Sequence, residues 1–80
     1  MKYAVEQRLR FIEFLVFHYG FINRSMLMDY FGISSPQASR DIGDYMELAP
    51  NNLIYNKNIK TYQRSLTFKR LWEWTTTSSN

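Results

Sequence analysis

One short stretch of the sequence, centred on Gly32, restricts the possible folds more than any other. Phe31 comes before the glycine and Ile33 follows it, so apolar side chains flank the turn. A glycine at this place can take the left-handed backbone conformation that ends a helix. Ser35 is then well placed as the cap of a new helix and Pro36 as its first residue, where a missing N–H costs nothing. The stretch therefore predicts two helices that cross at a steep angle through a tight turn.

Three helices are expected, over about residues 5–19, 24–31 and 36–48. The first has an apolar stripe at helical spacing, formed by Val5, Leu9, Ile12, Leu15, Val16 and Tyr19. Gly20 ends this helix, and Pro50 prevents the third helix from continuing. Either Asn23 or Ser25 is expected to cap the second helix.

The first helix also carries phenylalanines on the side opposite its apolar stripe. A helix that is apolar nearly all round is buried on both sides or contacts another surface. We expect these phenylalanines to be covered either by residues 66–74 of the same chain or by a partner subunit. The spacing of Phe68, Leu71 and Trp72 favours a helix in this C-terminal segment. The candidate dimer or partner surface comprises Phe11, Phe14, Phe17, Trp72 and Trp74.

Residues 53–63 show the pattern of a β-hairpin. Two short β-favouring runs, Leu53-Ile54-Tyr55 and Thr61-Tyr62-Gln63, flank a five-residue loop that is rich in asparagine. Three helices followed by a hairpin predict a mainly α fold with a small β-hairpin, the winged helix-turn-helix. A single domain is expected over residues 1–74, and the polar residues 75–80 are expected to form a disordered tail.

The third helix is the candidate reader of DNA bases. Ala38, Ile42 and Tyr45 fall on one side of it and define a buried face, so polar side chains occupy the other side. Small and hydrogen-bonding residues near the start of such a helix suit contacts with base edges in the major groove. The residues expected to contact bases are Ser34, Ser35, Gln37, Ser39 and Arg40. The residues expected to contact phosphates or the minor groove are Arg24, Ser25, Lys57, Asn58 and Lys60.

The polar side of the third helix also has a plainer interpretation, as an ordinary solvated face. Three acidic residues, Asp41, Asp44 and Glu47, would repel phosphates if they faced a groove. Asp44 stands four residues after Arg40 and is able to pair with it. Both interpretations stay open at this point.

Composition indicates the class of partner only weakly. The chain has 80 residues, and ten Lys and Arg against seven Asp and Glu give a net charge of +3, a mildly basic balance that suits nucleic acid. It contains no cysteine and no cluster with metal-ligand or catalytic spacing, so no metal, cofactor or enzymatic activity is expected. The longest apolar run, Phe14 to Phe17, is far shorter than the ~20 residues that span a bilayer. No signal peptide is visible either, which favours a cytoplasmic protein.

Several short motifs between about residues 8 and 62 recur together in a known family. They are Arg8 to Phe14, Asn23-Arg24-Ser25, Phe31-Gly32-Ile33-Ser34, Pro36-Gln37-Ala38-Ser39, Glu47-Leu48-Ala49-Pro50 and Lys60-Thr61-Tyr62. With them the sequence resembles the N-terminal winged helix-turn-helix of WYL-domain transcriptional repressors, in particular those that accompany bacterial phage-defence islands. The resemblance implies a bacterial or phage-borne repressor that dimerises and binds inverted repeats. It also implies that Asp41 and Glu47 are scaffold positions outside the groove. The family's WYL domain has no counterpart in these 80 residues, so ligand sensing by that domain is not carried over.

Together these features predict a sequence-specific, DNA-binding transcriptional regulator. We expect a repressor that acts by occlusion, with double-stranded DNA as its partner. One domain neutralises few phosphates, so we expect a homodimer on an inverted repeat. The alternative is a winged-helix module for protein interaction, which would use the aromatic surface to dock to or heterodimerise with a larger regulator.

Overall fold

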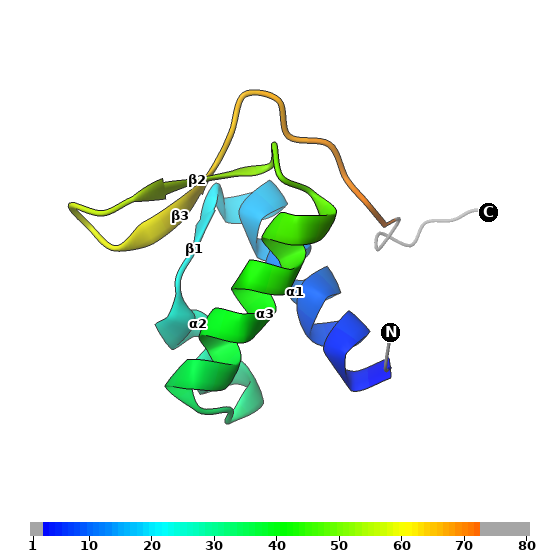
Figure 1. Cartoon of the computed structure of the whole chain (residues 1–80), viewed down its shortest axis with the longest axis vertical. Helices are drawn as coiled ribbons and strands as arrows, with labels where there is room; N and C mark the ends of the chain where they lie inside the picture. The colour runs from blue at the N-terminus through cyan, green and yellow to red at the C-terminus, as the bar shows by residue number, and fades with distance from the viewer. Residues whose placement is uncertain (1–2, 73–80) are drawn as a thin grey trace.

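The computed structural model describes residues 3–72 and contains three helices and a small antiparallel sheet (Figure 1). In chain order the elements are α1 (Tyr3–Tyr19), β1 (Phe21–Ile22), α2 (Arg24–Phe31), α3 (Ser35–Leu48), β2 (Leu53–Asn56) and β3 (Thr61–Arg64). The predicted winged helix-turn-helix class is confirmed. Trp74 and the tail predicted to be disordered, residues 75–80, lie outside the described residues.

Helix α1 lies against the other elements with its apolar stripe. Leu9, Ile12 and Val16 are buried there, as the helical spacing predicts. The helix ends at Gly20, whose φ of +87° is costly for a residue with a side chain. The N–H of Gly20 donates to the carbonyl oxygen of Val16 at 2.9 Å, which satisfies one of the last carbonyls of the helix.

The turn between α2 and α3 is built from local caps. The side chain of Asn23 accepts from the N–H of Met26 at 3.0 Å and starts α2. Gly32 ends α2 with a φ of +66°. The prediction that Ser35 caps α3 is wrong, because Ser35 is already helical and Ser34 is the residue with extended backbone. The Oγ of Ser34 accepts from the N–H of Gln37 at 3.2 Å.

The sheet has the strand order β1-β3-β2, with antiparallel pairing throughout. The hairpin of β2 and β3 pairs Leu53 with Arg64 at one end and Asn56 with Thr61 at the other. Strand β1 was not predicted, because two residues are too few to show an alternating pattern. It lies at the edge of the sheet, where Ile22 pairs with Tyr62.

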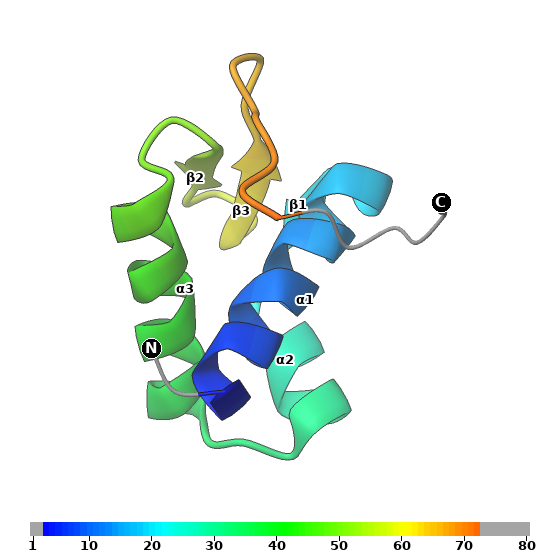
Figure 2. The ribbon, with the colours of Figure 1, turned by 90° about the vertical axis from the view of Figure 1, so that its right-hand side faces the viewer.

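The segment after the sheet is not the helix that its apolar spacing favoured. Residues 65–72, here called the C-terminal strap, lead from the end of the sheet down to α1 as an irregular chain (Figure 2). Their backbone bonds to side chains elsewhere: the N–H and carbonyl oxygen of Lys69 bond to the amide of Asn52 at 2.9 and 2.7 Å. The N–H groups of Leu71 and Trp72 donate to the carboxylate of Glu13 at 2.6 and 3.0 Å. These partners, distant in sequence, replace the i to i+4 bonds of a helix.

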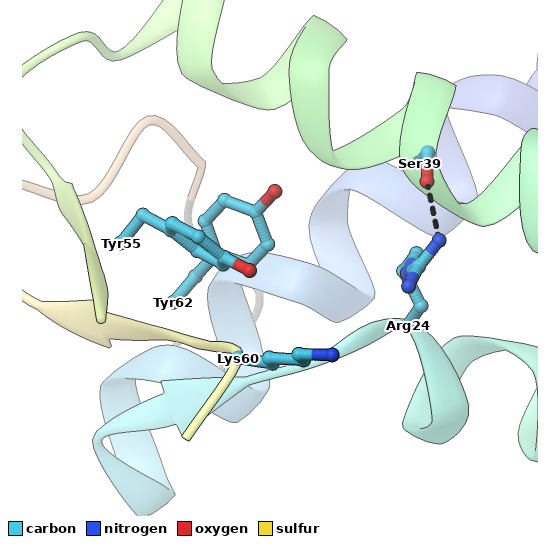
Figure 3. Close-up of a pocket in the computed structure, with 5 residues that line it drawn as sticks. All are labelled: Arg24, Ser39, Tyr55, Lys60 and Tyr62. Atoms are coloured by element: carbon cyan, nitrogen blue, oxygen red, sulfur yellow. Dashed lines mark hydrogen bonds between the residues drawn. The ribbon is translucent and has the colours of Figure 1, made fainter. Parts of the chain in front are cut away.

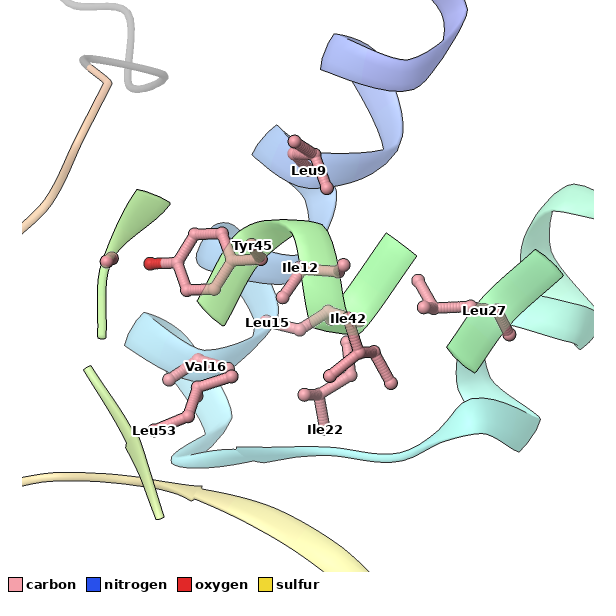
Figure 4. Packing of buried hydrophobic residues seen from close by; sticks show 11 residues of the cluster. Leu9, Ile12, Leu15, Val16, Ile22, Leu27, Ile42, Tyr45 and Leu53 are labelled. Atoms are coloured by element: carbon pink, nitrogen blue, oxygen red, sulfur yellow. The ribbon is translucent and has the colours of Figure 1, made fainter. Parts of the chain in front are cut away.

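The core lies where the helices meet the sheet (Figure 4). Its buried apolar residues are Leu9, Ile12, Leu15, Val16, Ile22, Leu27, Ala38, Ile42, Tyr45, Ala49 and Leu53. All three helices and two of the strands contribute to this list. The core therefore fixes both the crossing of α2 with α3 and the position of the hairpin.

The phenylalanines of α1 are covered in part by the chain itself. Phe11 stacks on Tyr30 of α2, with ring centroids 4.2 Å apart. Phe68 of the C-terminal strap lies 6.0 Å from Phe17, measured between ring centroids. Phe14 and Phe17 remain 37% and 38% exposed. The C-terminal segment therefore covers the phenylalanines of α1 as predicted, but only in part. Their further burial by a partner subunit stays a prediction.

Two arginines of α1 form ion pairs of different burial. Arg8 donates from Nε and Nη2 to the carboxylate of Asp41 on α3, at 2.5 and 3.3 Å, and the Asp41 side chain is 1% exposed. Arg10 donates to Glu6 one turn earlier at 2.7 Å, and both of these side chains are about one-third exposed. Only the first pair joins two elements.

Replacing Arg8 by Gln is expected to lower the free energy of unfolding by about 3 kcal/mol, because a buried carboxylate loses its charged partner. Arg10→Gln is the matched control, with an expected loss of about 1 kcal/mol from a surface ion pair and from the contact of the guanidinium with the Trp72 ring. Urea unfolding followed by circular dichroism measures both values. Similar losses in the two variants would contradict the assignment.

Tyr45 of α3 is buried within a polar network. Its hydroxyl donates to Glu13 at 2.8 Å and accepts from the amide of Asn52 at 2.9 Å. Burial raises the pKa of the Tyr45 phenol far above its usual value, and the carboxylate of Glu13 adds to the rise. In the unfolded chain the phenol loses its proton near pH 10.

Above about pH 10 the folded state therefore binds one more proton at Tyr45 than the unfolded state, so this group makes stability fall as pH rises. Tyr45→Phe removes that contribution. At about pH 9 we expect the variant to be less stable by about 1 kcal/mol, from the lost hydrogen bonds. Towards about pH 11 the gap should shrink by roughly 1.4 kcal/mol per pH unit. Denaturant unfolding at both pH values tests this, and a constant gap would contradict it.

Candidate nucleic-acid interface

Helix α3 separates its buried side from its polar side as its sequence predicts. Ala38, Ile42 and Tyr45 are buried against the core, whereas Ser39 and Arg40 are exposed. Within residues 3–72, the side chain of Arg40 forms no ion pair with Asp44, although the spacing allowed one. The guanidinium of Arg40 therefore remains available on the outer side of the helix.

The acidic residue nearest the middle of α3 does not face outward. Asp41 points into the protein, where Arg8 neutralises it and the side-chain amide nitrogen of Gln37 donates to it at 2.9 Å. This is the scaffold position that the family resemblance implied. Gln37 was expected to contact a base, and here its amide nitrogen is used inside the protein. Asp41 consequently places no unpaired charge on the outer side of α3.

Arg24 at the start of α2 reaches across to α3. Its Nη1 donates to Ser35 Oγ at 3.1 Å and to Ser39 Oγ at 3.4 Å. One residue predicted to bind phosphate thus contacts two residues predicted to face bases. Ser25, the next residue of α2, is also exposed, while Ser34 uses its hydroxyl to cap α3.

The hairpin places its basic residues at the tip. Lys57 and Asn58 are exposed there, and the N–H of Asn58 donates to the side chain of Asn56 at 3.0 Å. Lys60 closes the turn with a φ of +53°, a left-handed conformation that non-glycine residues seldom take. The tip is therefore a tight, ordered turn with two lysines.

A polar cleft of about 330 Å³ lies between the hairpin, α2 and α3 (Figure 3). Its lining comprises Arg24, Ser39, Tyr55, Lys60 and Tyr62. The structure thus brings together three of the predicted site residues, whereas Lys57 and Asn58 at the tip are outside this lining.

Tyr55 and Tyr62 were missed as site residues. They are directly opposite each other in the hairpin, and their ring centroids are 4.6 Å apart. Both had been assigned to strands, and cross-strand pairing puts their side chains on one face. The pairing register of the hairpin could have shown that the two tyrosines share a face. The sequence did not show that this face is the one that lies against α3.

None of the helices among residues 3–72 has the length and apolar character needed to span a lipid bilayer. The part of the chain that the structure describes also contains no group of three acidic or histidine side chains arranged to hold a metal ion.

Comparison with known proteins identifies the family. Residues 4–78 match the profile of the BrxR transcriptional regulator winged helix-turn-helix domain. The chain belongs to the BrxR family. The fold and the predicted resemblance to the DNA-binding domain of WYL-domain repressors agree with this result.

Curated relatives of this BrxR domain are repressors. Over 71 residues the chain is 42% identical to the DNA-binding transcriptional repressor CapW of Escherichia coli (strain KTE188) and 44% identical to that of Pseudomonas aeruginosa. The match to CapW of Stenotrophomonas maltophilia is 42% over 69 residues. These alignments cover 89%, 89% and 86% of the chain. The chain spans about a quarter of the length of these relatives, 23–24%.

In this BrxR domain, Ser34→Ala is expected to lower the free energy of unfolding by about 1 kcal/mol, because the first turn of α3 loses its cap. Ser35→Ala is the matched control and should cost less than about 0.5 kcal/mol, since its hydroxyl meets only an exposed arginine. Thermal unfolding of both variants measures the difference. A larger loss for Ser35→Ala would mean that the cap is assigned to the wrong serine.

Proposed function

We propose that this BrxR domain binds duplex DNA through the outer side of α3 and the hairpin, and that it acts in transcriptional repression. The observation that carries the proposal is the polarity of α3. In the N-terminal half of the helix the acidic residue, Asp41, is turned inward and paired with Arg8, and the exposed side carries Ser39 and Arg40. Asp44 is half-buried and Glu47 exposed, but both lie in the C-terminal half of α3, so the N-terminal half can lie in a major groove with no outward-facing carboxylate.

Arg40 is the residue best suited to read a base. An exposed guanidinium can donate two hydrogen bonds to a guanine, a pairing that discriminates between bases. Lys57 at the hairpin tip is suited to phosphate instead, because an ammonium on a flexible stem neutralises charge without reading sequence. The relatives named as DNA-binding transcriptional repressors support binding to DNA by this domain, because each alignment covers 89% of the chain.

Repression by a homodimer on an inverted repeat follows from the small size of the domain. A single module buries a modest area on DNA and contacts few phosphates, so two copies in a fixed spacing are needed for tight binding at physiological salt. Sedimentation of the chain at high micromolar concentration, with and without DNA, tests this. A strict monomer in both samples would overturn the dimer.

Binding to the DNA that flanks the encoding gene tests the proposal, by fluorescence anisotropy at two salt concentrations. We expect Arg40→Ala to lose about 1–3 kcal/mol of preference for that DNA over an unrelated duplex. Lys57→Ala should weaken binding to both duplexes alike and reduce the salt slope by about one. Unchanged binding in both variants would put the DNA surface elsewhere.

A second candidate function is a protein-interaction module. The observation in its favour is the exposed apolar surface of α1 and the C-terminal strap, where Phe14, Phe17 and Leu71 are 37%, 38% and 41% exposed. Phe17→Ser would weaken such an interaction and leave binding to DNA unchanged. The two functions are therefore separable with one variant on each surface.

A further inference from the structure

We propose that the cleft between the hairpin and α3 is a site for a single phosphate group, which Arg24 and Lys60 hold together. In a complex with DNA the group is a backbone phosphodiester, and this identification of its source rests on the proposed function. The cleft adjoins the base-reading surface and shares Ser39 with it, but its two cations come from α2 and the hairpin rather than from α3.

The lining of the cleft offers hydrogen-bond donors and positive charge. Arg24 and Lys60 supply two cations from different elements, and hydroxyl groups come from Ser39, Tyr55 and Tyr62. None of these five lining residues is acidic. A phosphodiester accepts hydrogen bonds and carries negative charge, so charge-assisted bonds of this kind favour it strongly. The volume of about 330 Å³ lies at the lower end of the range for ligand pockets and suits a phosphate with its sugar.

Arg24 is held in position before any ligand arrives. Its Nη1 group donates one hydrogen bond to Ser35 Oγ and one to Ser39 Oγ. The Nε and Nη2 groups carry the other three N–H donors of the guanidinium and remain for a ligand. Because the side chain is already ordered, it loses little conformational entropy when it binds.

Lys60 shows a backbone conformation that its residue type does not favour. Its φ of +53° suits glycine or asparagine, and a lysine there costs free energy. Figure 3 shows the side chain extending from the hairpin toward Arg24. A role for the ammonium group explains why this position carries lysine rather than glycine.

The tyrosine pair completes the cleft on the side of the sheet. Figure 3 shows both tyrosines projecting from the hairpin into the cleft, with the Tyr55 hydroxyl on the side of Lys60 and the Tyr62 hydroxyl nearer α3. The two rings, 4.6 Å apart, form a wall against which a deoxyribose can pack. A phosphate bound here contacts the hairpin and the helix pair at once. It would therefore fix the position of the hairpin relative to α3.

A double-mutant cycle tests whether Arg24 and Lys60 share one phosphate. Arg24→Gln, Lys60→Gln and the double variant are compared for binding to the duplex described above. Each single change should weaken binding about tenfold. If the two cations hold the same phosphate, the double variant should be weakened by only about 10- to 20-fold instead of about 100-fold.

The control cycle pairs Arg24→Gln with Lys57→Gln, a lysine of the same hairpin outside the cleft. This pair should be additive, giving about a 100-fold loss in the double variant if each single loss is tenfold. Additivity in both cycles would mean that Arg24 and Lys60 contact separate phosphates, and it would overturn the shared site.

A second arm uses inorganic phosphate alone, followed by NMR of the amide signals of Ser39 and Lys60. One possible result is that phosphate shifts these signals, that Lys60→Gln abolishes the shifts, and that the chain does not bind DNA. This result would support the phosphate site and overturn the proposed function. Absence of such shifts together with absence of DNA binding would overturn both.

Lys60→Gly separates binding from folding. Glycine accepts a φ of +53° without strain, so this variant should keep the melting temperature of the parent or exceed it. It should nevertheless bind the duplex about tenfold more weakly, because the ammonium is lost. A drop in melting temperature with unchanged DNA binding would show that Lys60 has a structural role only.

Discussion

The buried hydrogen bonds of Glu13 hold this small domain in its functional shape. Its carboxylate accepts from the Tyr45 hydroxyl of α3 and from two backbone N–H groups of the C-terminal strap. Asn52 joins the same network from the loop before β2. A buried carboxylate is tolerated only where donors surround it, so each of these elements has one place in which it can lie. A chain of 80 residues has a limited apolar core, and a network of this kind adds the specificity that the core lacks.

The rotation of α3 follows from two polar anchors on its inner side. Asp41 bonds to Arg8 and, one turn later, Tyr45 bonds to Glu13, so both anchors join α3 to α1. Turning the helix about its axis would separate the buried carboxylate of Asp41 from Arg8 and remove the Tyr45 donor from the buried carboxylate of Glu13, which costs more than repacking aliphatic side chains. The exposure of Ser39 and Arg40 is thus a consequence of contacts on the opposite side of the helix. The acidic residues that counted against DNA binding in the sequence prove, at Asp41, to be part of that anchor.

Sequence reasoning succeeded where the signal is local. Gly32 ends α2, the apolar side of α3 is buried, and the hairpin forms around its asparagine-rich turn. It failed where the partner is distant in sequence. The C-terminal strap has helical apolar spacing, yet its N–H groups bond to Glu13, 58 and 59 residues away. The cleft needs the fold to bring Arg24 against α3 and the tyrosine pair against both. The cap of α3 was misplaced by one residue, since two adjacent serines offer the same chemistry and only the backbone distinguishes them.

In the proposed complex the outer side of α3 and the hairpin together contact DNA, while the aromatic side of α1 does not. The test is an NMR titration of the isotopically labelled chain with a short DNA duplex, in which the amide chemical shifts are followed. The titration is done at low salt, because electrostatic binding then occupies the DNA-binding surface whatever the sequence of the duplex. We expect shifts at the amides of Ser39, Arg40 and Lys57, with those of Phe14 and Leu71 unchanged. Shifts confined to α1 and the C-terminal strap, with the amides of α3 unchanged, would contradict the proposed DNA-binding surface.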